Sequence, residues 1–408
     1  MINKLALTLF LVFLFFMPIY ISRLFGEKFN IIQTLIKSGI TLSVIILYLV
    51  NLKYEHTMKD YSMYPFNYRF FLLPWIYLLI AFLSIFWSSD VETTIKSLLG
   101  LITVLFLADL LTKKYELDYI LLKSLLILDS IIILSLISYI LKLPFAKMEF
   151  VDAIRYAGIT YGAHAIGRVA FIAFLIRIYF LSKNNPNLKT IFFNLIMLLV
   201  YIYSVLIADS RQIQLALIAI LPFWLLALNR YIFKEHRAKI YLILFFVFIL
   251  MILLMIIFNV GNISELFQRT GKEDVYTLTG RVYVWQSAFK LIDIQPILGY
   301  GYGAGGSELY IFHKLTSAWS TQSAHNIFIH QLLDLGIIGL IILILTLGYF
   351  LYLSIKLKSK FMISFFIFIA VVGFLERSLS GPPGLMYLFF ILFFFYLKQN
   401  KFNNKVIS

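Results

Sequence analysis

A succession of apolar runs, each near the length of a membrane-spanning helix, constrains this chain more than any other feature of its sequence. The first extends from Leu5 to about Ser22, and the later ones lie at about 30–51, 70–88, 95–112, 118–142, 165–182, 189–208, 211–229, 238–258, 325–352, 361–379 and 383–398. An α-helix needs about 20 apolar residues to cross the ~30 Å hydrocarbon core of a bilayer. The pattern predicts an all-α, polytopic membrane protein with about twelve transmembrane helices, forming a single integral membrane domain over residues 1–408.

The composition agrees with a membrane location. Hydrophobic residues make up 62% of the chain and charged residues 13%, which is unlike ordinary soluble domains. A net charge of +15 would suggest nucleic acid in a soluble protein. Here the basic residues stand in short breaks between apolar runs, where they set orientation and meet lipid headgroups, so we expect no nucleic-acid partner. The chain has no cysteine, which excludes thiolate catalysis and cysteine-based metal sites.

Basic residues concentrate in alternate breaks between the apolar runs. Examples are Lys113–Lys114, Arg230–Lys239, Lys356–Lys360 and the C-terminal tail. By the positive-inside rule these breaks and both termini face the cytoplasm. The longest break, at about 259–324, then forms one large loop outside the cytoplasm, between the ninth and tenth helices.

Several arginines fall on the outer face, at the ends of apolar runs. Arg211 begins a helix, where the positive end of the helix dipole disfavours a cation unless an anion such as Asp209 or a phosphate lies near. Arg155 and Arg168 bracket a glycine-containing turn, RYAGITYGAHAIGR, that serves equally well as a turn or as a ligand contact. His164, within this turn, is expected to be a polar loop residue. Glu376 and Arg377 also lie on this face and receive no role from the sequence.

The outer loop contains an arginine close to aromatic residues. Arg281 precedes Trp285, and its planar donor fork matches phosphate oxygens, while the indole ring could stack on a sugar. An amphipathic helix lying against the membrane would explain the same residues. The later segment PILGYGYGAGG has five glycines but lacks the phosphate-loop pattern, so we expect no nucleotide.

His325 is the sharpest signal of a catalytic group. It follows the polar stretch TSAWSTQSA and is predicted to open a long helix, on which Gly336 and Gly339 share its face. Small residues on that face would let a neighbouring helix pack closely. Imidazole exchanges protons near neutral pH and therefore suits general-base catalysis, although an interfacial histidine with a satisfied hydrogen bond is the alternative. The histidines and carboxylates are scattered, so no metal site is expected.

Taken together, these segments resemble the O-antigen ligase and polymerase superfamily. His325-Asn326, nine further residues and then Gly336-Ile337-Ile338-Gly339 match its HN-x9-GxxG signature. Other elements agree in order: Ser210–Arg211, Thr279–Trp285 as TGRxxxW, Pro296–Gly301 as PILGYG, and RYAGITYG as an R-x-x-G segment. The resemblance covers most of the chain, including the large loop before the histidine helix.

The resemblance implies a glycosyltransferase of the bacterial cytoplasmic (inner) membrane whose active site faces the periplasm. Such enzymes use an undecaprenyl-diphosphate-linked glycan as donor and need no cofactor or metal. By carry-over, Arg211 and Arg281 would bind the diphosphate, and His325 would take the proton from an acceptor hydroxyl that attacks the anomeric carbon with inversion. Arg155, Arg168, Trp285 and Asn326 are further candidates for substrate binding, and Gly336 and Gly339 are structural.

Several functions remain open at this stage. The HN-x9-GxxG match favours an O-antigen ligase that transfers glycan to lipid A-core in lipopolysaccharide biosynthesis. The main alternative is an O-antigen or capsule polysaccharide polymerase, for which the acceptor is a second lipid-linked glycan. An oligosaccharyltransferase that acts on protein is a less favoured alternative, because no soluble C-terminal extension follows the last helix. A membrane transporter or lipid flippase is disfavoured because mid-helix positions are almost uniformly apolar.

Overall fold

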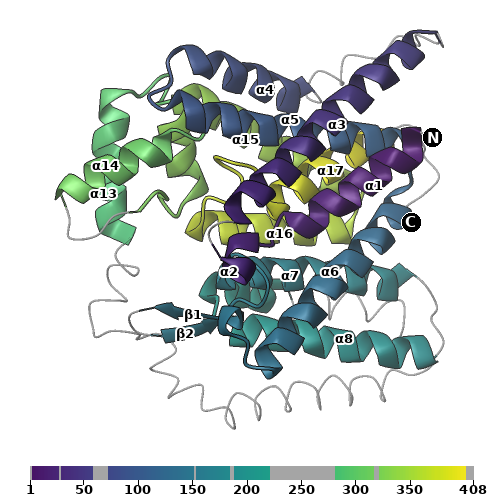
Figure 1. The fold of residues 1–408 in the computed structure, drawn as a ribbon. Coiled ribbons are helices and arrows are strands. Elements are labelled where there is room, and N and C mark those ends of the chain that lie inside the picture. The colour runs from purple at the N-terminus through teal and green to yellow at the C-terminus, as the bar shows by residue number, and fades with distance from the viewer. Residues whose placement is uncertain are drawn as a thin grey trace.

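The fold is known from a computed structural model that describes residues 2–26, 29–57, 72–150, 153–183, 188–220, 281–316 and 321–400 (Figure 1). The predicted span at 238–258, residues 221–229 of the span at 211–229, and the first third of the predicted outer loop lie outside these residues.

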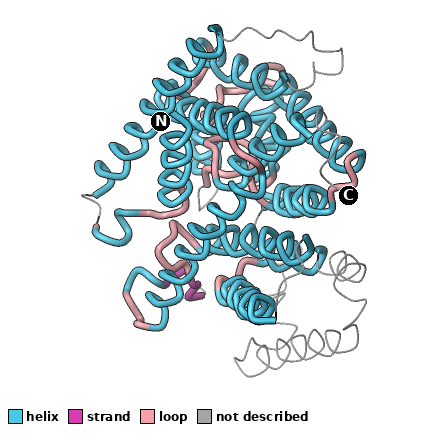
Figure 2. Tube along the Cα trace, turned by 90° about the vertical axis from the view of Figure 1, so that its right-hand side faces the viewer, coloured by secondary structure: helices cyan, strands magenta, loops and turns pink. Residues whose placement is uncertain are grey.

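Helices make up nearly all of the described chain. The first half contains α1 (Ile2–Phe16), α2 (Ile21–Phe25), α3 (Asn30–Thr57), α4 (Leu73–Leu83), the 3-10 turn η3 (Ser84–Phe86), α5 (Val91–Lys114), α6 (Leu117–Ile140), the 3-10 turn η4 (Pro144–Ala146), strands β1 (Lys147–Phe150) and β2 (Ala153–Tyr156), α7 (Ala163–Lys183) and α8 (Leu188–Ile207). A helix from Arg211 to Ile220 follows. The second half contains α13 (Arg281–Ile294), α14 (Gly305–Thr316), α15 (Ile327–Lys356), α16 (Lys360–Leu375) and α17 (Leu385–Asn400). The two strands form an antiparallel hairpin, seen in magenta in Figure 2.

The apolar runs coincide with helices wherever the structure describes them. Among the described residues, six helices are long and apolar enough to cross a membrane: α3, α5, α6, α7, α8 and α15. Five shorter apolar helices accompany them: α1, α4 with η3, Arg211–Ile220, α16 and α17. The protein is therefore a mostly helical, multi-pass membrane protein, and the total of about twelve spans stays a prediction.

Two predicted spans are too long. The first helix ends at Phe16 rather than near Ser22, because Pro18 lacks a backbone donor and disfavours the helical conformation of the residue before it. The span predicted at 361–379 ends at Leu375, because Glu376 has an extended backbone (φ −155°, ψ 156°).

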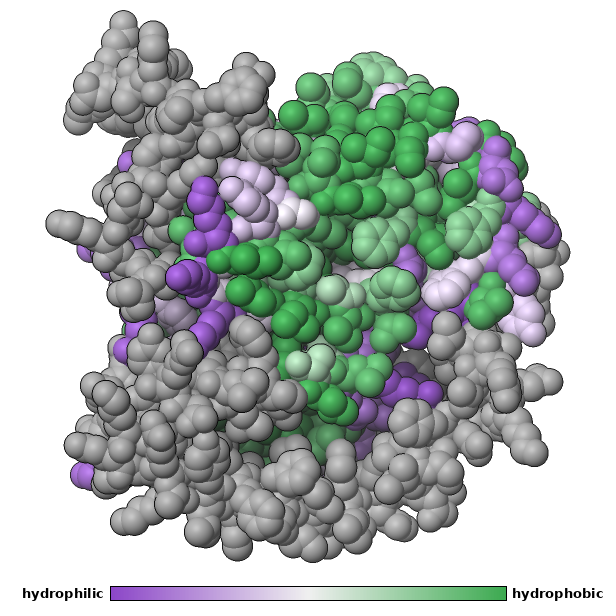
Figure 3. Space-filling model, turned by 180° about the vertical axis from the view of Figure 1, so that it is seen from behind, coloured by the Kyte–Doolittle hydropathy of each residue, from purple (hydrophilic) through white to green (hydrophobic). Residues whose placement is uncertain are grey.

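Elements of the predicted outer face gather on one side of the molecule. Figure 1 shows the N-terminus on the right, whereas the β1–β2 hairpin, α13 and α14 lie on the left, with α2 between them. Viewed from behind, hydrophobic atoms form a broad area with hydrophilic atoms at its rim and in a hollow (Figure 3). An exterior of this kind suits lipid on the sides of the bundle and water at its ends.

An ion pair between two helices corrects the expectation that mid-helix positions are almost uniformly apolar. Arg177 of α7 is 5% exposed and pairs with Asp129 of α6, and it also donates to Tyr201 (2.8 Å from Nη2) and Asn194 (2.8 Å from Nη1) of α8. Because every partner is hydrogen-bonded, this charge is compensated within the bundle.

The long helix α15 is broken, which overturns the predicted continuous stripe from His325 to Gly336. The backbone leaves the helical region at Leu335 (φ −129°, ψ 18°) and Gly336 (φ 58°, ψ −157°). His325 also lies before the helix, with φ 48°, and Asn326 is the N-cap. Gly336 and Gly339 therefore do not form a packing stripe with His325.

The PILGYG segment fills this break with its own backbone. Ile337 N–H donates to Pro296 O (2.9 Å), Tyr300 N–H to Leu333 O (2.8 Å) and Gly301 N–H to Asp334 O (2.9 Å). A Cβ on Gly336 would lie 2.2 Å from Ile297 O, and one on Gly299 would lie 2.6 Å from Gly336 N. Both glycines are thus required by the close approach of two backbones.

We predict that Gly336→Ala lowers the stability of the protein by about 3 kcal/mol or more, because Ala is strained at this φ and its Cβ meets a carbonyl. Gly348→Ala, in the same helix with nothing within 4 Å of the added Cβ, is the matched control and should be neutral or stabilising. Thermal unfolding of the two purified variants tests this difference, and equal melting temperatures would contradict it.

Candidate active site

A cavity of about 970 Å³ is lined by residues that are far apart in the sequence. Parts of α1, α3 and α5 line one portion of it, and β2, the start of α7 and the loops before α15 and after α16 line another. Its polar lining includes both predicted and unexpected residues: Arg155, His164, Arg168, Ser323, His325, Glu376 and Arg377. The structure thus brings one predicted catalytic residue and two predicted binding residues into a single space.

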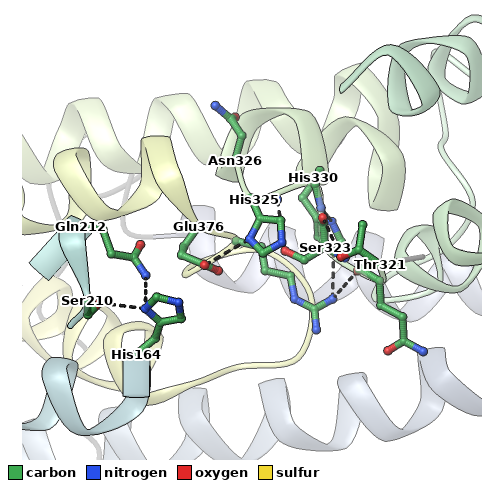
Figure 4. Close-up of polar contacts among 12 residues, drawn as sticks. His164, Ser210, Gln212, Thr321, Ser323, His325, Asn326, His330 and Glu376 are labelled. Carbon is green, nitrogen blue, oxygen red and sulfur yellow. Dashed lines mark hydrogen bonds and ion pairs between the residues drawn. The ribbon is translucent and has the colours of Figure 1, made fainter. Parts of the chain in front are cut away.

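His325 is paired with a carboxylate in this cavity. Its Nδ1 lies 3.1 Å from Oε1 of Glu376, and Figure 4 shows the two side chains facing one another. The His325 side chain is 30% exposed and that of Glu376 is 10% exposed. A carboxylate acceptor assigns the proton to Nδ1, so Nε2 keeps its lone pair for an incoming proton.

Local structure fixes the histidine from three sides. Asn326 Oδ1 accepts from Phe328 N–H (2.9 Å) and Ile329 N–H (3.1 Å), which caps α15 directly after His325. The His325 N–H donates to Ser323 Oγ (3.1 Å), and Trp285 Nε1 donates to Ala324 O (2.8 Å). The left-handed backbone of His325 is sparsely populated for residues other than glycine, and these bonds hold it there.

Glu376 is an ionised group in a buried position. Burial alone would raise the pKa of its carboxyl, but the hydrogen bond and charge of His325, with the charges of His164 and Arg168, hold that pKa well below its usual range. Glu376 therefore stays a carboxylate across the physiological range and can stabilise a protonated His325.

A second histidine reaches the cavity from the first turn of α7. His164 Nδ1 lies 2.8 Å from Ser210 Oγ and 3.0 Å from Gln212 Nε2, as drawn in Figure 4. His164 was expected to be a loop residue, but it is helical, lines the cavity and acts electrostatically on Glu376.

Two of the predicted arginines line the cavity and a third lies beside it. Burial and the charge of Arg211 lower the pKa of Arg155, which places these two cations close together. Within the described residues, Nε of Arg168 and Nη2 of Arg211 are buried without a hydrogen-bond partner. Arg211 does not line the cavity, but its neighbours Ser210 and Gln212 both bond to His164. Buried donors of this kind suit an anionic ligand.

The outer-loop candidates have mainly structural contacts. Arg281 is the first residue of α13 and does not line the cavity. Trp285 packs in a small core between α13, α14 and α15 and donates to the backbone beside His325. Asn326 is 5% exposed and uses its side chain for capping, with Nδ2 donating to Phe374 O (3.3 Å).

Arg377, next to Glu376, holds the same segment from the other side. Its Nη1 donates to Gln322 O (2.9 Å) and lies 3.4 Å from Nε2 of His330. His330 is fully buried and lies 3.9 Å from Asp334, whose Oδ1 accepts from Gly305 N–H (3.1 Å). Sequence reasoning gave Glu376 and Arg377 no role, although two adjacent charges directly after an apolar run were a usable signal.

No group of three His, Asp or Glu side chains within the described ranges is arranged to hold a metal ion. The cavity instead offers a base with a free ring nitrogen, an ionised partner and several cations. This arrangement can remove a proton from a neutral substrate group and stabilise negative charge on a phosphate.

Comparisons with known proteins agree with the motifs. Residues 195–344 match the model of the O-Antigen ligase family. The chain is 30% identical over 223 residues to the ComP-specific O-oligosaccharyltransferase of Acinetobacter baylyi, a match that covers 52% of this chain and 38% of that protein. It is 33% identical over 96 residues to the exopolysaccharide production protein ExoQ of Rhizobium meliloti, covering 21% of each. The chain thus spans well under half the length of either relative.

The matched segment holds Arg211, Arg281, His325, Gly336 and Gly339. The cavity residues Arg155, His164, Arg168, Glu376 and Arg377 lie outside it. Together, the family match, the relatives and the spaced motifs confirm the resemblance to the O-antigen ligase superfamily that was drawn from the sequence, with the family match confined to residues 195–344.

Proposed function

We propose that this protein is a metal-independent, inverting glycosyltransferase that takes its glycan from an undecaprenyl-diphosphate-linked donor at the periplasmic face of the inner membrane. The observation that carries the proposal is the His325–Glu376 pair, which lies in a cavity lined by arginines at the outer end of the bundle. This pair supplies a base, and the arginines supply the charge that a diphosphate leaving group requires.

His325 acts as the general base. With Nδ1 bonded to Glu376, Nε2 takes the proton of the acceptor hydroxyl as its oxygen attacks the anomeric carbon. The bond from that carbon to the phosphate oxygen breaks, and the lipid diphosphate leaves with the electron pair. The proton remains on His325, where the Glu376 carboxylate stabilises it. A positioned base of this kind contributes about 10²–10⁴-fold to the rate.

The arginines stabilise the leaving group. Arg168 presents a buried Nε with no hydrogen-bond partner in the described chain, and Arg155 lines the same cavity. Arg211 lies close to Arg155 and would bind the same diphosphate. Arg281 retains its proposed role through the TGRxxxW resemblance alone. Guanidinium groups bind phosphate oxygens bidentately, which stabilises developing negative charge without a cofactor.

The acceptor distinguishes the members of the superfamily. We favour an O-antigen ligase that passes glycan to lipid A-core, with polymerisation on a second lipid-linked glycan as the alternative. The name of the Acinetobacter relative adds a protein acceptor as a further candidate. Transport or lipid flipping is disfavoured because the family match and a relative named for oligosaccharyl transfer both point to an enzyme.

We predict that His325→Ala lowers glycan transfer by about 10²–10⁴-fold, because the base is lost while donor binding is kept. His56→Ala, at the far end of α3 from the residues that line the cavity, is the matched control. Transfer is measured with membranes containing equal amounts of each variant. Normal transfer by His325→Ala would remove this residue from the mechanism.

Glu376→Gln should lower the rate of transfer at saturating donor and acceptor, because the carboxylate that bonds to His325 Nδ1 and stabilises positive charge on the ring is lost. Glu92→Gln, which removes the carboxylate of an exposed helical pair, is the control. A wild-type rate for Glu376→Gln, with equal amounts of each variant in the membrane, would contradict this role.

A deletion strain separates the acceptor classes. For a ligase, long glycan disappears from lipid A-core on a lipopolysaccharide gel, and polymer accumulates on the lipid carrier. For a polymerase, a single repeat unit remains on the core. Unchanged surface glycan would contradict both, and loss of a glycosylated protein instead would indicate protein as the acceptor.

A further inference from the structure

The first half of α3 carries a polar stripe that faces the cavity. The stripe follows helical spacing at positions i, i+3, i+4, i+7, i+8 and i+11, and all its members line the cavity: Asn30, Gln33, Thr34, Lys37, Ser38 and Thr41. The other side of this helix is apolar and open, with Ile31 69% and Leu35 65% exposed. The apolar face of this membrane-spanning helix therefore faces lipid, and its polar face lines the cavity.

Most of the polar groups on this stripe have structural partners. Gln33 bonds to the backbone of Ile19 and Ile21, Thr34 bonds within its own helix, and Thr41 meets Thr103 of α5. Lys37 has no hydrogen-bond or ion-pair partner within the described chain. An ionisable side chain in a membrane span is expensive, and one that faces a cavity marks a functional site by default.

A second lysine approaches from α5. The Thr41–Thr103 hydrogen bond (2.8 Å) brings α3 and α5 together, and Lys37 and Lys96 precede this contact by one and two turns. Lys96 also lines the cavity. Its ion pair with Glu92 is exposed on both sides, so an anionic ligand could take its place at little cost.

The charges of the cavity leave room for a second anion. Its described lining holds five basic side chains and one acidic one: Lys37, Lys96, Arg155, Arg168, Arg377 and Glu376. A lipid diphosphate brings roughly two negative charges, one on each phosphate. After the donor is bound next to His325, Lys37 therefore remains without a counter-charge, and Lys96 keeps only its exposed pair with Glu92.

Apolar side chains line the same cavity as these lysines. They include Phe13 and Phe16 of α1 and Met17 directly after it, and only 28% of the α3 span is buried inside the molecule. A molecule with phosphate at one end and hydrocarbon at the other fits this portion of the cavity. A hydrophilic protein segment would leave the apolar wall unused.

We propose that Lys37 and Lys96 form a phosphate subsite for the acceptor, and that the acceptor is an anionic lipid. The assignment of this lipid as the acceptor rests on the function proposed above. The subsite itself is inferred from the polar stripe of α3, the charges of the cavity and its apolar wall. Arginines beside His325 hold the donor, and the two lysines hold the phosphate of the second lipid.

The natural absence of cysteine allows a test that does not depend on transfer. Ser38→Cys places one thiol on the stripe next to Lys37, and its modification by an uncharged, water-soluble maleimide reports whether the subsite is occupied. The full chain is placed in vesicles of phosphatidylcholine, in vesicles that also contain phosphatidic acid, and in phosphatidylcholine vesicles with added inorganic phosphate.

Phosphatidic acid should slow modification of Ser38→Cys about fivefold or more, because a phosphate held by charge-assisted hydrogen bonds from the two lysines covers the neighbouring thiol. Adding Lys37→Gln and Lys96→Gln should abolish this protection. Lys142→Gln, an exposed lysine at the outer end of α6 that does not line the cavity, should leave it unchanged.

Protection that persists without the two lysines, or no protection at all, would overturn the subsite. Equal protection by inorganic phosphate would overturn the claim that the ligand is a lipid. If Lys37→Gln leaves the KM for the acceptor unchanged and a protein receives the glycan, the acceptor assignment also fails. Labelling needs no catalysis, so the two tests are independent. Normal transfer by His325→Ala would contradict the proposed function but not the subsite, and the absence of protection in Ser38→Cys would contradict the subsite but not the proposed function.

Discussion

The backbone of the 296–301 segment completes the broken helix α15, and the geometry of the candidate site depends on that fit. A break within a membrane-spanning helix frees carbonyl and N–H groups that have no water to bond to. Here Pro296, Tyr300 and Gly301 supply the missing partners, and Gly299 and Gly336 allow the two chains to approach. The outer helices α13 and α14 are thereby fixed against the helix that follows His325.

Glu376 and Arg377 fix the position of His325, the proposed base. The two adjacent residues follow α16, and one bonds to His325 while the other bonds to Gln322 and lies against His330. Arg377 therefore contacts both ends of the short segment 322–330, and Glu376 bonds to His325 within it. Together these contacts hold the sparsely populated backbone conformation of His325.

The lengths of the apolar runs predicted the helices of the described chain but not the polar residues within them. The apolar runs matched helices within a few residues because hydrocarbon thickness sets their length. The same count of apolar residues hid the polar stripe of α3 and the Asp129–Arg177 pair, since a few polar residues barely change the average over a span. The glycine signature was found, but its purpose was misjudged, because a left-handed break cannot be distinguished from a close helix contact by spacing alone.

The sequence by itself determined that this is a helical, multi-pass membrane protein, it showed the resemblance to the O-antigen ligase superfamily, and it identified His325 as the candidate base. Those conclusions depend on local chemistry: run length, charge in the breaks and short motifs. Only the tertiary structure decided what surrounds His325. Glu376 lies 51 residues from it in the chain, and Arg155 and Arg168 lie farther still. Contacts between such distant residues follow from how the helices pack, which no short pattern in the sequence encodes.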